Sequence, residues 1–330
     1  MKRFFAVSLL ALLVSLGPCR AEQAPASFSV CWWNIENWGE TNRYLGGQRI
    51  EHAMKPPAEI GAVMAILKRL HPDILGVAEV IQAPDDRYLH LLRDLLAREG
   101  LDYRYMSTVR GEDRRIQVAL FSRFPILDDA PFVRDRFPMT LQSASTGEVR
   151  KASWRVGRGF LNCRIEVAPG YSLQVMATHL KSKLPEKGIV PEEVGETGDE
   201  VVRRAEAGLL REHIDAFSRA HPGDDLLVIG DFNDVPESRA IRSIEGDASP
   251  VQDLPLADWA GETWTENDSY DKKRERIDYL FADGSLRGRF VPGESFLYRP
   301  RDGDGPQYGI LAGSDHRALF ARFLVPVKGR

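Results

Sequence analysis

Several short apolar runs in the sequence adjoin residues that can do chemistry. The run Val30–Trp33 leads into an asparagine and a glutamate, and the run Ile74–Ala78 leads into a glutamate. Carboxylate and amide oxygens are the ligands that Mg²⁺, Mn²⁺ or Ca²⁺ prefer, and a histidine beside them can move a proton. Six places along the chain share this pattern: Asn34 with Glu36, Glu79, His179, Asp231 with Asn233, Asp278, and Asp315 with His316.

Each of these polar residues alone has an ordinary structural explanation. Residues 230–233 (Gly-Asp-Phe-Asn) are typical of a turn, Glu79 suits a solvated strand end, and His179 suits a packed histidine. Six such places together are harder to explain, because carboxylates share a buried site only if a cation or protons offset their repulsion. The set predicts a hydrolase in which a hard divalent cation and hydrogen-bond donors act on a phosphoester.

Strands must position these residues, because the runs beside them have β character. Strands are predicted at residues 28–33, 73–80, 116–122, 160–167, 172–178, 226–230, 277–282 and 318–325. Helical periodicity appears at residues 60–67, 89–96 and 202–217, and residues 181–200 are expected to form a long loop. Two strand runs follow each other across Pro169-Gly170, which is typical of a hairpin. We therefore expect an α/β protein with two packed sheets that helices cover on the outside.

Composition bounds the class of protein. The chain has 330 residues, 43% of them hydrophobic and 28% charged, with a formal net charge of −4. This balance excludes a disordered chain, a collagen-like repeat and a polytopic membrane protein, and it gives no overall basic field for nucleic acid. The three cysteines lack metal-finger spacing, and no His-x-x-x-His pair occurs, so a zinc site is not expected.

The start of the sequence is typical of a secretory signal peptide. Lys2 and Arg3 precede an apolar run that extends to Leu16, and small residues follow up to Ala21. We expect cleavage after residue 21, export to the periplasm or the extracellular space, and a single catalytic domain over residues 22–330. We also expect a monomer without stable membrane insertion. Cys31 and Cys163 both lie in apolar runs, which favours free buried thiols.

The order of the motifs resembles one enzyme superfamily. The motifs are Trp33-Asn34-Ile35, Glu79, Thr178-His179-Leu180, Gly230-Asp231-Phe232-Asn233, Arg276-Ile277-Asp278-Tyr279 and Ser314-Asp315-His316. They resemble those of the endonuclease/exonuclease/phosphatase superfamily, which includes DNase I, the apurinic-site endonucleases, the inositol polyphosphate 5-phosphatases and the neutral sphingomyelinases. Over about residues 28–325 the chain is similar to a secreted, bacterial-type member. The resemblance implies a four-layer α/β/β/α sandwich of two packed mixed sheets, with the site at one edge of both.

The resemblance implies a metal site. Glu79 matches the principal metal-binding glutamate of the superfamily, and Asn34 matches the asparagine that contacts the phosphate or the metal. Glu36 lies where the apurinic-site enzymes carry an aspartate, and Asp315 matches the neighbouring acid on the metal side. The implied cofactor is Mg²⁺, with Mn²⁺ or Ca²⁺ as alternatives.

The resemblance also implies catalytic roles. Asp231 matches the carboxylate that orients or deprotonates the attacking water, and Asn233 matches the amide that holds the phosphate. His316, paired with Asp278, matches the histidine that binds the phosphate or acts as a base. His179 matches the second histidine of the DNase I, sphingomyelinase and 5-phosphatase branches, where the apurinic-site branch has a Tyr-x-x-Asn element.

The residues leave the substrate open. Residues 110–158 contain ten lysines and arginines but only six aspartates and glutamates, which suits a polyanion such as nucleic acid. Arginines on hairpins also keep strand edges soluble. We expect a nuclease that cleaves phosphodiester bonds. The alternative is a phospholipid or inositol-phosphate phosphodiesterase or phosphatase, although no exposed apolar hairpin stands out. A remote alternative is an inactive binding module, but Asp231, Asn233 and His316 are all present.

Overall fold

The computed structural model describes residues 27–191, 195–267, 273–299 and 313–326. The signal peptide predicted at residues 1–21 lies outside these ranges. No helix within them combines the length and the apolar composition that crossing a membrane requires.

Two six-stranded sheets form the centre of the molecule. The first sheet has the order β17 (Phe296–Leu297), β18 (Leu319–Leu324), β1 (Ser27–Trp38), β4 (Ile74–Ile81), β6 (Ile116–Ser122) and β5 (Tyr105–Val109). The second has the order β13 (Val251–Asp253), β16 (Asp278–Asp283), β12 (Asp225–Asp231), β11 (Tyr171–His179), β10 (Phe160–Ala168) and β7 (Ile126–Asp129). The neighbours β1 and β4 are parallel, as are β11 and β12, whereas the other pairs are antiparallel. Both sheets are therefore mixed.

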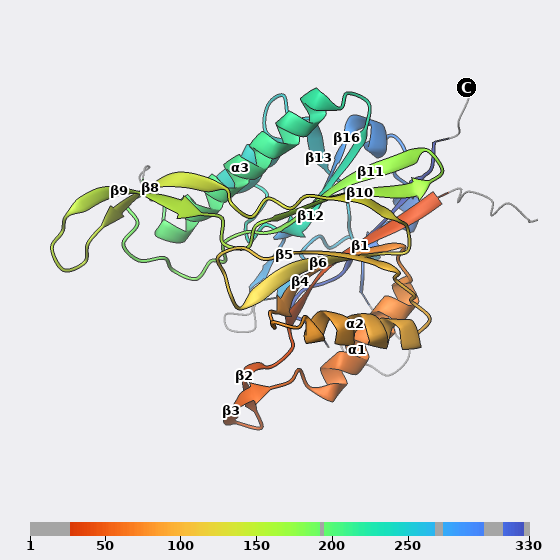
Figure 1. The fold of residues 1–330 in the computed structure, drawn as a ribbon, viewed down its shortest axis with the longest axis horizontal. Helices are drawn as coiled ribbons and strands as arrows, with labels where there is room; N and C mark the ends of the chain where they lie inside the picture. Colours follow the sequence, from red (N-terminus) through yellow and green to blue (C-terminus); the bar gives the residue numbers. More distant parts are fainter. Residues whose placement is uncertain (1–26, 192–194, 268–272, 300–312, 327–330) are drawn as a thin grey trace, which may run out of the picture.

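Helices cover the outer faces of the two sheets. Figure 1 shows α1 (Pro57–Leu70) and α2 (Arg87–Arg98) on one side of the stacked sheets and α3 (Gly198–Ala220) on the other. The short helices are α4 (Arg239–Glu245), which belongs to the α3 side, α5 (Gly284–Arg287) and a 3₁₀ turn at Pro292–Glu294. The predicted four-layer α/β/β/α sandwich is confirmed.

Three apolar cores hold the layers together. The central core lies between the sheets and contains residues such as Trp32, Leu161 and Ile229, all with 0% exposure. Two further cores join each sheet to its helices. Because most strands are buried on both faces, they are nearly continuous apolar runs, which is why the sequence predicts them so well. Cys31 and Cys163 are buried in different cores and are free, as expected.

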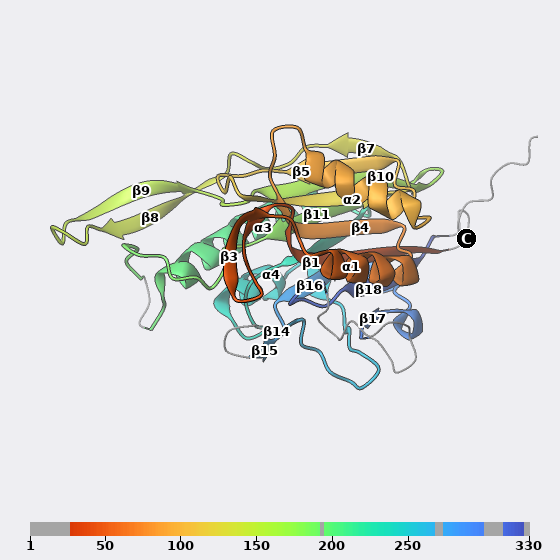
Figure 2. The same ribbon diagram turned by 90° about the horizontal axis from the view of Figure 1, so that it is seen from below.

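Three two-stranded ribbons lie outside the main sheets. They are β2 (Thr41–Leu45) with β3 (Gln48–Ala53), β8 (Arg136–Gln142) with β9 (Val149–Arg155), and β14 (Glu266–Asn267) with β15 (Arg274–Glu275). The β8–β9 ribbon, called the arm below, extends beyond the sandwich in Figures 1 and 2. Apolar runs do not mark these ribbons in the sequence, because few of their residues are buried.

The topology brings the candidate residues to one edge. Because β1 and β4 are parallel and Asn34 pairs with Ala78, Asn34 and Glu79 come to the same edge of the first sheet. In the second sheet, Asp231 at the end of β12 pairs with His179 at the end of β11 and with Asp278 at the start of β16. Gly230 permits this close approach, because a Cβ atom there would lie 2.7 Å from the carbonyl oxygen of Thr178.

Candidate active site

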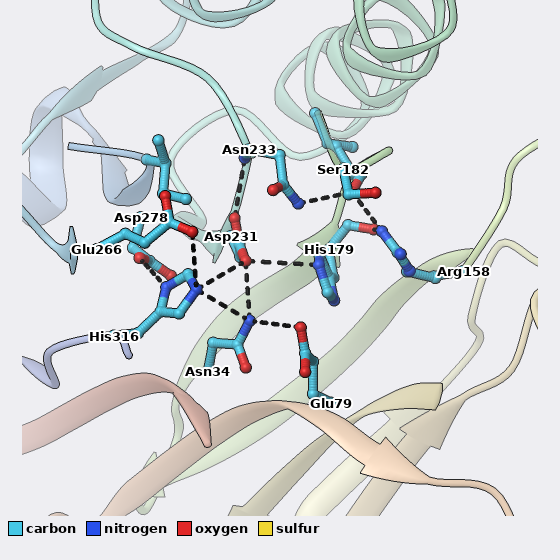
Figure 3. A network of polar contacts seen from close by, with 12 residues as sticks. Asn34, Glu79, Arg158, His179, Ser182, Asp231, Asn233, Glu266, Asp278 and His316 are labelled. Carbon is cyan, nitrogen blue, oxygen red and sulfur yellow. Dashed lines mark hydrogen bonds and ion pairs between the residues drawn. The ribbon is translucent and has the colours of Figure 1, made fainter. Parts of the chain in front are cut away.

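A buried histidine–aspartate pair lies at the edge of the second sheet. The Nδ1 atom of His316 lies 2.7 Å from Oδ2 of Asp278, which is fully buried (Figure 3). The indole Nε1 of Trp32 donates to the other oxygen of Asp278 at 2.9 Å. The sequence predicts this contact between His316 and Asp278, and the geometry agrees. Asp278 therefore fixes the orientation of the imidazole and leaves its Nε2 atom facing the other site residues.

The segment that carries His316 is attached to β1. The Ser314 hydroxyl donates to the carbonyl oxygen of Asn34 at 2.6 Å, and the indole of Trp33 donates to the carbonyl oxygen of His316 at 3.0 Å. Ser314 Oγ also accepts the backbone N–H of His316. These contacts explain why the Ser-Asp-His and Trp-Asn motifs, almost three hundred residues apart in the sequence, act as one structural unit.

The surroundings of His316 favour its charged form. Burial lowers the pKa of the imidazole, but the negative charges of Asp278 and Asp231 outweigh this effect and hold the pKa well above its ordinary value. The Nε2 atom lies 3.8 Å from Oδ2 of Asp231 and 4.0 Å from Oε1 of Glu266. The charged form of His316 carries an N–H on Nε2 that can be donated to an anionic ligand.

Asp231 is the centre of the polar network in Figure 3. Its Oδ2 atom accepts the Asn34 amide N–H at 3.0 Å and lies 3.4 Å from Nε2 of His179. Its Oδ1 atom accepts the backbone N–H of Asn233 at 2.9 Å. Burial and the charge of Asp278 raise the pKa of Asp231 to about 8, although His316 opposes this shift. A carboxylate with a raised pKa is suited to accept a proton.

His179 is buried and neutral. Burial lowers the pKa of the imidazole well below its ordinary value, and the charges of Arg158 and His316 lower it further. The Arg158 guanidinium donates to the carbonyl oxygens of Leu180, at 2.5 Å, and of His179, at 3.5 Å. Asp231 therefore lies between two histidines whose surroundings favour opposite forms, the neutral form of His179 and the charged form of His316.

Three carboxylates form a second group beside Asn34. Glu79 accepts the Asn34 amide at 3.2 Å and the backbone N–H of Asn37 at 3.0 Å. Burial raises the pKa of Glu36 to about 7, with further contributions from Asp315 and Glu79, while Lys55 opposes them. Burial also raises the pKa of Asp315, and the charge of Glu79 adds to the effect. Glu36, Glu79 and Asp315, called the acidic group below, are therefore close enough to repel one another.

The backbone around the acidic group adopts an uncommon conformation. Glu36, Asn37 and Glu79 all have positive φ angles, of 47°, 50° and 62°, and Asn233 has a φ of 55°. Non-glycine residues rarely occupy this region, and those that do are often held there at functional sites. Lys55, which is 1% exposed, helps to hold the loop by donating to the carbonyl oxygen of Glu36 at 2.8 Å.

The structure brings all nine predicted residues to this edge. The side-chain amides of Asn34 and Asn233, however, form hydrogen bonds within the protein, whereas the sequence resemblance assigns them to the phosphate or the metal. The Oδ1 atom of Asn34 accepts the backbone N–H of Glu36 at 3.0 Å, so its amide bridges Glu79 and Asp231. One N–H of the Asn233 amide already donates to the carbonyl oxygen of Leu180 at 3.0 Å. Both asparagines thus position neighbouring groups, whatever they contact in a substrate.

Sequence reasoning missed three residues of the site. Glu266, on β14, lies beside His316, and burial raises its pKa to about 7. Trp32 belongs to an apolar run, so nothing in the sequence marks its indole as the donor to Asp278. Arg158 stands between two glycines, Gly157 and Gly159, and this Gly-Arg-Gly sequence is the one signal that could have drawn attention to it.

Comparisons with known proteins agree with this geometry. A sequence model of the Endonuclease/Exonuclease/phosphatase family matches residues 32–316. No curated protein sequence matches the chain significantly. Truncated TDP2 from Caenorhabditis elegans superposes with a TM-score of 0.54 at 17% identity, covering 91% of this chain and 98% of that one. The human Nocturnin catalytic domain with a bound sulfate anion gives a TM-score of 0.55 at 18% identity, with 90% and 94% coverage.

A bacterial structure is similar to the same degree. The endonuclease/exonuclease/phosphatase from Bacteroides vulgatus gives a TM-score of 0.55 at 18% identity, covering 92% of this chain and 100% of that one. At these identities the superpositions establish the fold alone. The family model matches the chain from Trp32 to His316, a range that includes all the site residues described above, and it establishes the family. This chain belongs to the endonuclease/exonuclease/phosphatase family.

Proposed function

We propose that the protein is a divalent-metal-dependent hydrolase that cleaves phosphodiester bonds in nucleic acid. The observation that carries the proposal is the position of Asp231, hydrogen-bonded to Asn34 between His179 and the paired His316, with the acidic group next to it. This arrangement offers a proton acceptor, two histidines that can face a phosphate, and a set of hard oxygen donors within one network.

The acidic group has the hard oxygen donors that a divalent cation prefers, and its Asp315 also belongs to a cluster with Glu266 and His316 whose ligand atoms lie within 4.8 Å of one another. The Oδ1 atom of Asp315 is buried and accepts no hydrogen bond from the described residues, which is costly for a carboxylate oxygen unless a ligand satisfies it. Glu79, Asp315 and Glu36 would hold the ion, and Mg²⁺ suits a site made only of oxygens. When bound, such an ion would neutralise the negative charge of a phosphate oxygen.

Asp231 is the group that would accept a proton from water. Its pKa of about 8 places its proton affinity near neutral pH, and the Asn34 amide and the Asn233 backbone N–H hold both of its oxygens in place. A general base works best when its pKa lies near the working pH and its geometry is fixed. Asp231 thus orients the water and receives its proton as the new oxygen–phosphorus bond forms. The bond from phosphorus to the ester oxygen breaks in the same reaction, and that oxygen leaves as an alcohol after it takes a proton from solvent.

The two histidines would contact the phosphate in different ways. His316 is charged and keeps its proton, because Asp278 accepts from Nδ1, so Nε2–H can donate to an anionic phosphate oxygen. His179 is neutral and buried, so it donates a hydrogen bond without adding a charge. Together they stabilise the additional negative charge that develops as water attacks.

We expect His179→Ala to lower kcat by a factor of about 10²–10⁴, the usual size of a general acid–base or donor contribution. The same substitution at His90, an exposed histidine on α2, is the matched control and should leave kcat unchanged. Steady-state hydrolysis of bis-p-nitrophenyl phosphate, with circular dichroism to confirm folding, measures both variants. An unchanged kcat in folded His179→Ala would show that His179 only packs.

The choice of nucleic acid is supported by charge. The arm and its flanking loops carry most of the basic stretch at residues 110–158, and Arg115 is close enough to His179 to lower its pKa. One structural neighbour, Nocturnin, was solved with a bound sulfate anion, which is the size of a phosphate. A phosphate-rich polymer fits this surface better than a small neutral molecule.

One observation favours a second candidate, a phosphodiesterase that acts on lipid headgroups. The sequence suggests no exposed apolar hairpin, but one hairpin of the structure exposes two large apolar side chains, each paired with an arginine. Tyr44 and Ile50 on the β2–β3 hairpin are 77% and 43% exposed. Arginines alternate with them, which hides the apolar character of the hairpin in the sequence. An exposed hairpin of this kind next to the acidic group is able to contact a membrane surface.

A substrate panel tests the proposed function. Plasmid DNA, RNA, bis-p-nitrophenyl phosphate, inositol phosphates and sphingomyelin vesicles are each incubated with Mg²⁺, Mn²⁺, Ca²⁺ or EDTA. We expect cleavage of nucleic acid and of the small diester with a divalent cation, and no cleavage in EDTA. Selective cleavage of sphingomyelin would replace the nuclease by the second candidate. Activity on none of the substrates would contradict both.

We further propose that the protein is exported and acts as a monomer. The support for export is the basic start and apolar run of residues 1–21, and the support for a monomer is that the predicted site is complete within one chain. Fractionation of expressing cells and sedimentation of the purified protein test the two statements.

A further inference from the structure

The base of the arm is attached to the end of β11, next to His179. The buried carboxylate of Glu206, on α3, accepts the backbone N–H of Gly157 and that of Lys181, both at 2.8 Å. Arg158 joins the same two segments through its contacts with the carbonyl oxygens of His179 and Leu180. The arm therefore leaves the sandwich from the edge that carries the site, as Figures 1 and 2 show.

The register of the arm gives its two faces different characters. Phe137 pairs with Trp154 on one face, and Met139 follows on the same face; these side chains pack into the core of α3. The opposite face, called the outer face below, carries the pairs Arg136↔Arg155 and Thr140↔Lys151. One face therefore holds the arm in place, and the other presents cations and hydroxyls to solvent.

The charges of the outer face are only partly compensated within the protein. Like charges directly across two strands are unfavourable, yet Arg136 and Arg155 are direct partners. Arg155 forms an ion pair with Glu112. Arg136 and Lys151 are exposed and have no acidic partner among the residues that the structure describes, whereas the adjacent Arg150 pairs with Leu141 and so lies on the other face.

A further arginine connects the outer face to His179. The loop at residues 112–115 packs against the base of the arm, where the backbone N–H of Asp113 donates to the carbonyl oxygen of Gly157 at 2.6 Å. Arg115, at the end of this loop, is exposed and its charge lowers the pKa of His179. A series of cations thus runs from the active site, through Arg115 and Arg155, to the outer part of the arm.

We propose that the outer face of the arm binds the phosphate backbone of a nucleic-acid strand on one side of the phosphate being cleaved. This inference rests on the proposed function and makes it more specific, because it requires a polymer. Arg136 and Lys151 stand at register positions four residues apart, or about 13 Å along a strand, so they contact different phosphates. A mononucleotide in the active site cannot reach both.

The chemistry of the outer face favours nucleic acid over a membrane. Thr140 and Ser153 lie on it beside the cations, and Val149 at the tip is the only large apolar side chain of the arm that is more than half exposed. Hydroxyls and cations are the usual donors to phosphate oxygens in protein–nucleic acid contacts. A single valine adds little apolar area for insertion into lipid.

The experiment compares two triple variants with the wild-type protein. Arg136→Gln/Lys151→Gln/Arg155→Gln removes the three cations of the outer face. Arg93→Gln/Arg98→Gln/Arg104→Gln removes the same charge from α2 and the loop that follows it. Binding of a fluorescent single-stranded 20-mer is measured by anisotropy in EDTA over a range of salt concentrations. Hydrolysis of bis-p-nitrophenyl phosphate with Mg²⁺ is measured on the same proteins.

We expect the arm variant to bind the 20-mer about 10- to 100-fold more weakly at low salt. The slope of log Kd against log salt should fall by about two, since each lost phosphate contact removes about 0.7 on a single strand. The control variant should bind like the wild type, and all three should hydrolyse the small diester equally. An unchanged Kd and slope in the arm variant would overturn the inference.

Two other outcomes would also overturn it. A parallel loss of small-diester hydrolysis would show that the arm only supports the active site. Weaker binding to phosphatidylserine vesicles with unchanged binding to the 20-mer would assign the outer face to a membrane. Because binding is measured in EDTA, it is independent of turnover: a wild-type protein that binds the 20-mer through the arm but hydrolyses no diester would contradict the proposed function alone.

Discussion

Replacement of Asp231 by asparagine is expected to reduce phosphodiester hydrolysis by about 10³-fold or more. Asparagine keeps the shape of the side chain, but its single carbonyl oxygen can accept from only one of Asn34 and the backbone of Asn233, and it cannot take a proton from water. The melting temperature should change little, because one hydrogen bond is lost while a repulsion is relieved. Burial and the charge of Asp278 disfavour an ionised Asp231 in the folded protein, so neutralising it relieves repulsion.

His316→Gln is expected to reduce hydrolysis to a similar extent, because it removes the charged donor. The double variant should be little worse than the worse single variant, since both residues act in the same step. From the sequence, even His316→Ala is expected to leave stability unchanged. The structure alters that expectation: truncation would leave an Asp278 oxygen buried without its partner, and a lower melting temperature should follow. Glutamine is therefore the better probe.

Activity and melting temperature measured together separate the outcomes. If Asp231→Asn kept wild-type kcat, Asp231 would not be the proton acceptor. If the effects of Asp231→Asn and His316→Gln on log kcat simply added, the two residues would act independently, and the network drawn from Asp231 to both histidines would have no functional meaning.

Glu79→Gln is expected to lower activity about 100-fold or more at low Mg²⁺ and to recover part of it at high Mg²⁺. Asn34 and the backbone of Asn37 hold the Glu79 carboxylate rigidly, and its loss removes a full negative charge from the acidic group. A weakened cation site can be filled by mass action, whereas a lost proton acceptor cannot. The dependence of rate on Mg²⁺ concentration measures this effect.

Glu59→Gln is the matched control for Glu79→Gln. Glu59 is a nearby acid on α1 that pairs with Lys55 at 3.2 Å and lies outside the acidic group. Neutralising it changes the local charge by the same amount and should shift the Mg²⁺ dependence only slightly. Equal behaviour of the two variants, or full activity of Glu79→Gln at low Mg²⁺, would remove Glu79 from the metal site.

The main strands and helices are predictable from sequence because burial dictates their composition. Runs such as Leu226–Ile229 are apolar throughout, and their strands are covered on both faces. The ribbons are different. In the arm, only Phe137 and Met139 are buried, and the partners of the arm on α3 and at Ile189 are distant in the sequence. Tertiary contacts decide the conformation there, so local patterns carry little signal.

The residues of the site likewise divide into those that the sequence predicts and those that it does not. Polar residues at strand ends, such as Asp231 and Glu79, contrast with the apolar runs before them and are visible in the sequence. Trp32 and Glu266 are invisible for opposite reasons: Trp32 looks like any core residue, and Glu266 looks like any solvated one. The backbone N–H of Glu36 donates to Oδ1 of Asn34 where the φ angles are near +50°. The sequence does not predict these angles.

The central claim is that this cluster, with a divalent cation, hydrolyses phosphodiester bonds. The most direct measurement is the rate of bis-p-nitrophenyl phosphate hydrolysis by EDTA-treated protein before and after addition of Mg²⁺, in the wild type and in Asp231→Asn. We predict that the wild type is inactive in EDTA and regains activity with Mg²⁺, while Asp231→Asn stays inactive at every Mg²⁺ concentration. A full rate in EDTA, or equal rates in the two proteins, would contradict the claim.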